Sequence, residues 1–162
     1  MENNIQKLGE LIKEIKIAMM TTVDQDGTLR SRPMATQKTE FDGTLWFFTN
    51  ASSPKVEELE QSHHVNLSYA APDSNTYVSV TGTAALVRDQ AKNKELWNAL
   101  LRAWFPKGLE DPDLALLHVM VEKAEFWDSP SSTMVQMAGF VKAIATGKAY
   151  QPSPGEHEKI TL

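Results

Sequence analysis

The sequence has no cysteine among its 162 residues. This excludes disulfide bonds, zinc sites with cysteine ligands and thiol catalysis, so redox chemistry would require a bound cofactor. The chain also lacks the roughly 18 consecutive apolar residues of a membrane-spanning helix. Its first residues carry acidic side chains where a signal peptide would have a basic start and an unbroken apolar core. We therefore predict a cytoplasmic protein that does not bind membranes.

Dense basic runs are missing as well. The chain has 16 basic and 21 acidic residues, a net charge of −5, which argues against nucleic acid as a partner. The marks of serine hydrolases, of P-loop NTPases and of dinucleotide-binding folds are absent. The histidines show no metal-ligand spacing, because the adjacent His63 and His64 would point to opposite faces of a strand. We predict no metal site.

Periodicity divides the chain into one amphipathic helix followed by short strands. Apolar residues recur at helical spacing over the first sixteen residues, at Ile5, Leu8, Ile12 and Ile15, which predicts a helix lying on the body of the protein. Short β-branched and apolar runs between turn residues predict six strands, at residues 17–24, 28–40, 45–50, 64–71, 76–88 and 114–127. Gly82, inside the fifth run, predicts a bulge or bend of the kind that turns the corner of a barrel.

Further helices are predicted at residues 55–62, 89–104 and from Ser131 or Ser132 to about residue 145. We interpret Glu57, Glu58 and Glu60 as the solvated face of the first of these helices. The pattern predicts an α+β fold, mainly β, in which antiparallel strands form a barrel with flanking helices. We expect one domain over residues 1–150 and a flexible C-terminal tail over residues 151–162, which contain proline and glycine.

Two neighbouring segments carry groups that suit a phosphate. Arg30-Ser31-Arg32-Pro33-Met34 lies on one strand, and residues 49–55 (TNASSPK) run from the next strand into a helix that Ser53 can cap, with Pro54 at its first position. A helix start offers free N–H groups and a positive dipole, and arginine grips phosphate with a planar fork. The alternative is that these basic side chains only project from a solvated edge strand and that Ser53 is an ordinary cap.

The order of these motifs resembles a known family. R-S-R-P-M, then F-F-T-N, then S-S-P-K are similar to the FMN-binding signature of the pyridoxamine 5'-phosphate oxidase-like split barrels. V-S-V-T-G-T-A, W-F-P-K-G-L-E-D-P-D-L and E-F-W-D resemble the general stress protein 26-like branch, so the likeness covers about residues 8–130. The resemblance implies a six-stranded antiparallel split β-barrel of Greek-key type and a homodimer with FMN at its interface.

The resemblance also assigns the residues that would hold FMN. The phosphate would be held by Arg32, Ser53, Lys55 and Lys38. Phe48 and Thr49 would line the ribityl region, and the strand around Pro33, Met34 and Ala35 would flank the ring. Contacts completing the site would come from Tyr77, Trp127 and residues 104–107, although Trp104 and Trp127 also suit core or dimer packing. For Trp97 we expect packing alone.

One departure limits the function that the resemblance implies. Pyridoxamine phosphate oxidases follow the E-F-W segment with an Arg-x-His pair that grips the substrate, whereas residues 128–140 read DSPSSTMVQMAGF. We therefore predict that this chain does not oxidise pyridoxamine phosphate. We expect an FMN-dependent oxidoreductase of unknown substrate, with NAD(P)H or a small molecule as partner. A non-catalytic FMN-binding module for stress responses and a split barrel with little flavin affinity are the alternatives.

Overall fold

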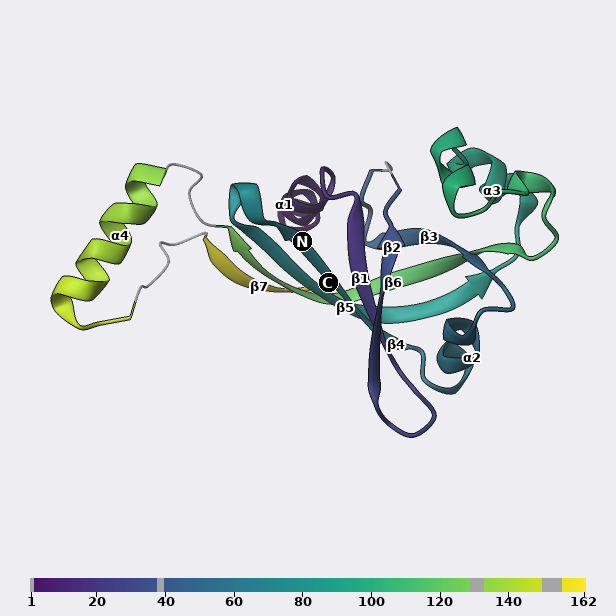
Figure 1. Ribbon diagram of the computed structural model, residues 1–162, viewed down its shortest axis with the longest axis horizontal. Helices are drawn as coiled ribbons and strands as arrows, with labels where there is room; N and C mark the ends of the chain where they lie inside the picture. The colour runs from purple at the N-terminus through teal and green to yellow at the C-terminus, as the bar shows by residue number, and fades with distance from the viewer. Residues whose placement is uncertain (1, 38–39, 129–132, 150–155) are drawn as a thin grey trace.

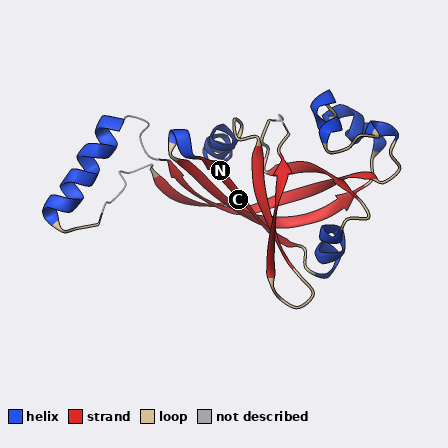
Figure 2. Cartoon of the chain, viewed as in Figure 1, coloured by secondary structure: helices blue, strands red, loops and turns tan. Residues whose placement is uncertain are grey.

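An antiparallel sheet curls into a half-open barrel with helices at its ends and sides (Figure 1; strands red in Figure 2). The computed structural model describes residues 2–37, 40–128, 133–149 and 156–162. The strand order is β2-β1-β4-β5-β6-β3, and β7 pairs with β6. Their bounds are β1 (Ile17–Val23), β2 (Leu29–Ala35), β3 (Thr44–Asn50), β4 (His64–Ala71), β5 (Thr76–Val87), β6 (Leu114–Asp128) and β7 (His157–Thr161). This architecture confirms the predicted antiparallel, mainly β, split barrel.

The long strands β5 and β6 form the centre of the sheet. β6 pairs with β5 along one edge, and on its other edge it pairs with β3 over residues 114–120 and with β7 over residues 123–127. The register of β5 against β6 shifts between Thr81 and Gly82. The predicted bulge at Gly82 is therefore present, and it bends the strand pair that joins the two halves of the sheet.

The tight turns follow from Asp-Gly pairs. Gly27 has φ of 83° and Gly43 has φ of 102°, values that glycine adopts without steric cost. The Asp26 carboxylate accepts hydrogen bonds from both the backbone N–H and the hydroxyl of Thr28, at 3.0 and 2.6 Å. These bonds fix the β1–β2 hairpin, as the sequence predicts.

α1 (Glu2–Ile12) lies on the body of the protein against the sheet, as its periodicity predicts. Leu8 and Ile12 are buried, as is Ile15 just after the helix. They pack in one cluster with inward-facing strand residues such as Met20, Leu67 and Val80. Burial of this apolar stripe holds α1 on the sheet.

The helix predicted at residues 89–104 is interrupted. α3 (Gln90–Leu96) ends at Trp97, and a 3₁₀ helix follows over Ala99–Ala103. The Asn98 side chain accepts a hydrogen bond from the N–H of Leu100 at 2.9 Å. Asparagine that bonds the nearby backbone in this way favours a new helix start over the continuation of a helix.

The C-terminal tail differs from the flexible segment that we expected. His157–Thr161 form β7, in which Ile160 is buried and its neighbours are exposed. The strand forms because β6 extends beyond β3 and leaves an edge free for pairing. Residues 151–155 lie outside the described residues.

α4 (Thr133–Thr146) forms where a last helix is predicted, and its expected cap, Ser131 or Ser132, lies outside the described residues. The helix stands apart from the barrel (Figure 1). Within the part of the chain that the structure describes, no helix combines the length and apolarity needed to cross a membrane.

Candidate functional site

A pocket of about 410 Å³ opens between the β1–β2 edge, the end of β3 and the 3₁₀ segment after α3. Its size falls within the roughly 300–1,000 Å³ typical of small-molecule sites. Ten residues line it: Ile17, Pro33, Met34, Ala35, Phe48, Asn50, Lys55, Leu101, Trp104 and Phe105. Most of them are apolar, and the single titratable side chain among these ten is Lys55.

Several residues that the sequence predicts to bind the cofactor therefore meet at one place. Those that line the pocket are Pro33, Met34, Ala35, Phe48, Lys55 and Trp104, and Phe105 belongs to the predicted segment 104–107. Ile17, Asn50 and Leu101 also line it and were missed. Ile17 pairs with Ala35 in the β1–β2 register, so the predicted hairpin could have identified Ile17 as a neighbour of this strand.

Aromatic side chains form one wall of the pocket. Phe48 is buried and meets Trp97 edge-on, with ring centroids 5.6 Å apart. Its ring also lies 6.2 Å from that of Phe105. Trp97 therefore packs against the wall, whereas Trp104 is 59% exposed at the pocket. Core packing does not explain Trp104.

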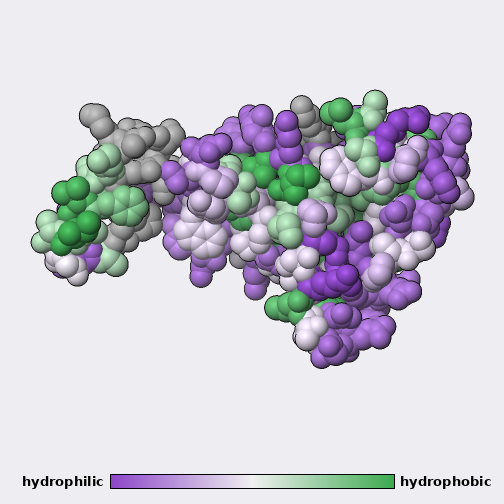
Figure 3. Space-filling view, viewed as in Figure 1, coloured by the Kyte–Doolittle hydropathy of each residue, from purple (hydrophilic) through white to green (hydrophobic). Residues whose placement is uncertain are grey.

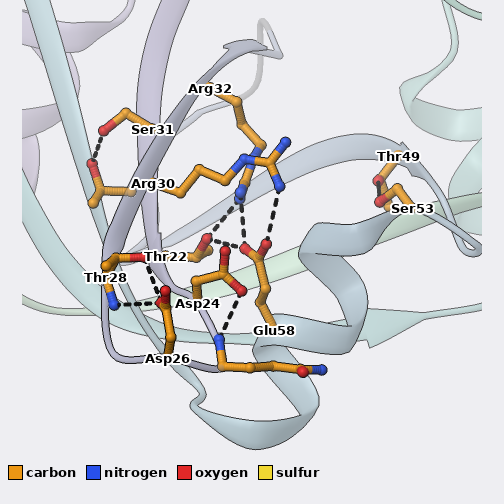
Figure 4. A network of polar contacts seen from close by, with 12 residues as sticks. Thr22, Asp24, Asp26, Thr28, Arg30, Ser31, Arg32, Thr49, Ser53 and Glu58 are labelled. Atoms are coloured by element: carbon orange, nitrogen blue, oxygen red, sulfur yellow. Dashed lines mark hydrogen bonds and ion pairs between the residues drawn. The ribbon is translucent and has the colours of Figure 1, made fainter.

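The loop between β3 and α2 (Pro54–Gln61) forms the polar end of the site. Ser53 occupies the N-cap position of α2, but its hydroxyl makes no capping bond to the helix. The hydroxyl instead lies 3.4 Å from that of Thr49, which is buried (Figure 4). Thr49 therefore contacts the loop. It does not line the pocket, although the resemblance predicts that it lines the ribityl region.

Asp113 holds this loop in place. Its carboxylate accepts bonds from the N–H and the hydroxyl of Ser52, at 3.0 and 2.6 Å. Its carbonyl accepts the N–H of Ala51 at 2.7 Å. The E-D-P-D-L segment thus positions the start of α2, a role that the spacing of the motifs does not reveal.

A buried carboxylate lies among the cationic side chains beside the pocket (Figure 4). Arg32 donates to Glu58 at 2.8 Å and to the hydroxyl of Thr22 at 2.7 Å. Thr22 in turn donates to Glu58, and Arg30 forms an ion pair with Glu58 at 3.5 Å. The interpretation of Glu58 as part of a solvated face is wrong, because the residue is only 4% exposed.

The charges of this cluster influence one another. Burial, together with repulsion from Arg32, lowers the pKa of the Lys55 ammonium, and attraction to Glu58 partly opposes this. For Glu58 burial acts to raise the pKa, but bonds from Thr22 and Arg32 outweigh it and the pKa is lowered. Arg32 contacts Glu58 directly, and Glu58 lies on the same helix as Lys55, so the two segments that the sequence predicts to bind a phosphate do converge.

The remaining predicted residues do not line the pocket. Tyr77 and Trp127 are paired neighbours on β5 and β6. β5 lies two strands from β1 in the sheet, and at roughly 4.8 Å between neighbouring strands the two strands are about 10 Å apart. Both side chains belong to the same exposed sheet face as Ile17. Lys38 lies outside the described residues.

Comparisons with known proteins agree with this architecture. The sequence model of the family described as "pyridoxamine 5'-phosphate oxidase like" matches residues 3–151. Protein bli-3 of Neurospora crassa is 32% identical over 158 residues, which cover 91% of this chain and 76% of that protein.

Solved structures show the same fold. A general stress FMN/FAD binding protein from Xanthomonas citri superimposes with a TM-score of 0.68 at 27% identity, covering 82% of this chain and 93% of that one. General stress protein 26 from Bacillus anthracis has a TM-score of 0.68 at 22% identity, with 76% and 93% covered. From its sequence and its split-barrel fold, the chain belongs to the pyridoxamine 5'-phosphate oxidase-like family.

Proposed function

We propose that this protein is an FMN-binding protein of the general stress type, with the flavin ring in the pocket beside Phe48 and Trp104. The proposal rests on one observation: the pocket has apolar and aromatic walls, and at one end it is lined by the cation Lys55, which lies near Arg32. A flavin mononucleotide has the matching pattern of a planar aromatic ring and a doubly charged phosphate. The FMN/FAD binding relative from Xanthomonas citri supports the same assignment.

The residues present fit this cofactor. Lys55 is a half-buried cation whose charged form is penalised by burial, and a phosphate beside it would relieve that penalty. The strand that contributes Pro33, Met34 and Ala35 would flank the ring with its backbone, and Lys55, Arg32 and the Ser53 hydroxyl would hold the phosphate. Bound flavin supplies hydride or electron transfer, while the protein supplies orientation and electrostatics.

Replacement of Lys55 tests where the phosphate binds. We expect Lys55→Ala to weaken FMN binding by about 1–3 kcal/mol, the loss of one charge-assisted hydrogen bond, and to leave riboflavin binding unchanged. Quenching of flavin fluorescence measures both affinities. Lys94→Ala, an exposed lysine on α3, is the matched control. Equal losses for FMN and riboflavin would place the phosphate elsewhere.

We further propose that the protein is an oxidoreductase with a small substrate. Lys55 is the single titratable group among the ten residues lining the pocket. In an enzyme, the redox step would therefore be carried out by the flavin. The same lining also suits a non-catalytic binding module. Stopped-flow absorbance with NADH or NADPH separates the two functions. Rapid bleaching of bound FMN, reversed by an added acceptor, is expected of an enzyme; no bleaching with either nucleotide would favour the binding module.

A homodimer would cover two exposed apolar surfaces. The first is the outer sheet face, defined by Ile17, Met19, Tyr77 and Trp127, each 39–42% exposed. The second is one face of α4, defined by Met137, Val141 and Ile144, at 61–83% exposure (Figure 3). Exposed apolar patches of this kind mark interaction sites, and a two-fold axis would bury the same patches on both chains. The pocket borders the first surface at Ile17, so a partner would complete its rim.

Light scattering tests this assembly. We expect a mass twice the 18.1 kDa of one chain and a shift toward the monomer in Met19→Glu, because a charge on the outer sheet face cannot be buried without a partner. Lys94→Glu is a control away from that face. A monomeric wild-type protein at micromolar concentration would contradict the dimer.

A further inference from the structure

Glu58 is an unexpected neighbour for an anion-binding site. Its side chain is 5% exposed and it faces both arginines from the middle of α2 (Figure 4). A carboxylate repels a phosphate, so a site built only to attract anions would leave this position neutral. The role of Glu58 must therefore lie in what it does to the cations around it.

The contacts show that Glu58 fixes Arg32. One terminal nitrogen of the guanidinium donates to Glu58 at 2.8 Å and the other to Thr22 at 2.7 Å. Thr22 is itself buried and donates to the same carboxylate oxygen. The three side chains thus form a closed ring of hydrogen bonds. Arginine has five N–H donors, so the two bonds described leave three for a ligand.

Glu58 also offsets repulsion within the cluster. Arg30, Arg32 and Lys55 carry three positive charges and Glu58 carries one negative charge, which leaves a net of two. Glu58 lies 3.5 Å from Arg30 and favours the charged form of Lys55. A net charge of two positive units matches the dianion of a phosphate monoester.

We propose that Glu58 is a positioning residue that holds Arg32 in the orientation that binds the flavin phosphate and so sets the preference for phosphorylated over unphosphorylated flavin. This inference rests on the proposed FMN site. A guanidinium that is already held by Glu58 and Thr22 loses less conformational freedom when the phosphate binds. Neutralising Glu58 therefore weakens phosphate binding, although simple removal of a negative charge would strengthen it.

The test compares the affinities of FMN and riboflavin in Glu58→Gln. We expect the FMN-to-riboflavin affinity ratio to fall about ten-fold, with riboflavin affinity unchanged. Glu57→Gln makes the same charge change at an exposed position of the same helix and is expected to leave the ratio unchanged. In the background of Arg32→Ala, Glu58→Gln should leave the ratio unchanged, because Arg32 is no longer there to be positioned. A purely structural role would instead lower both affinities alike and leave the ratio unchanged in the wild-type background as well.

The outcomes separate this inference from the function on which it rests. If wild-type protein binds no FMN, the proposed function fails and this inference fails with it. If wild-type protein binds FMN but Glu58→Gln has an unchanged or higher ratio, the positioning role alone is overturned. Should Glu58→Gln not fold, Thr22→Val removes the other partner of Arg32 with little change of shape and is expected to lower the same ratio about three-fold; an unchanged ratio there overturns the inference.

Discussion

Gly82→Ala is expected to destabilise the protein by about 3 kcal/mol or more, at the upper end of the cost of overpacking. A Cβ built on Gly82 would lie 2.2 Å from the carbonyl oxygen of Met120 and 3.2 Å from the Cα of Val121. Both neighbours are backbone atoms of β6, so no side-chain rotation can relieve the clash. The close approach of the two backbones occurs where the register of β5 shifts against β6, so the added methyl group would disturb this part of the fold.

Urea unfolding of Gly82→Ala and Gly27→Ala separates this clash from the ordinary cost of replacing glycine. Gly27 has φ of 83° and nothing within 4 Å of the added Cβ, so its replacement should cost only about 1–2 kcal/mol for the left-handed backbone. Gly82 lacks a positive φ, and its cost arises from the clash alone. A Gly82→Ala protein as stable as Gly27→Ala would contradict the close approach of β5 to β6 at Gly82.

Arg32→Ala is expected to lower both stability and FMN affinity. Removing one partner of a buried ion pair costs about 3–5 kcal/mol, and the lower end applies here because Arg32 is 16% exposed and Arg30 remains near Glu58. Loss of the bond to phosphate should weaken FMN binding by about 1–3 kcal/mol. Urea unfolding and fluorescence titration measure the two losses.

The double variant Arg32→Ala/Glu58→Gln distinguishes the two effects. Neutralising Glu58 removes the unpaired buried charge, so we expect most of the stability to return while FMN affinity stays low. Recovery of both properties would show that Arg32 acts only through folding. Recovery of neither would show that the unpaired charge of Glu58 is not the cause of the lost stability.

Local signals made the strands and their turns predictable. Asp26-Gly27 specifies a hairpin through side-chain bonds and a positive φ that the two residues supply themselves. Ser53-Pro54 likewise marks the start of α2 because proline fits the first helical position. The burial of one face of α1 was also predictable, because helical geometry places Leu8 and Ile12 on the same side of the helix.

Features that depend on distant partners were missed. Glu58 appears in a run of acidic residues typical of an exposed face, and only the packing of α2 against β1 places it beside Thr22. β7 forms because β6 is longer than β3, which short-range patterns in residues 151–162 do not reveal. Asn98 interrupts an apolar stripe that would otherwise continue a helix.

The site itself was predictable in part. The pairing of β1 with β2 and the turn into α2 bring Pro33, Phe48 and Lys55 together, and the sequence motifs already indicate these segments. Asp113 acts from 61 residues away on Ser52, so its role required the fold. Tyr77 and Trp127 share a sheet face with Ile17 but lie two and three strands away from it, a separation that follows from the strand order.

The most direct test of the central proposal is an equilibrium titration of the purified protein with FMN, followed by quenching of flavin fluorescence, with riboflavin titrated in parallel. We predict saturable quenching at one FMN per chain and an affinity for FMN at least about ten-fold above that for riboflavin, equivalent to about 1.4 kcal/mol from the phosphate contacts. Absence of quenching by FMN, or equal affinities for the two flavins, would contradict a phosphate site at Lys55 and Arg32.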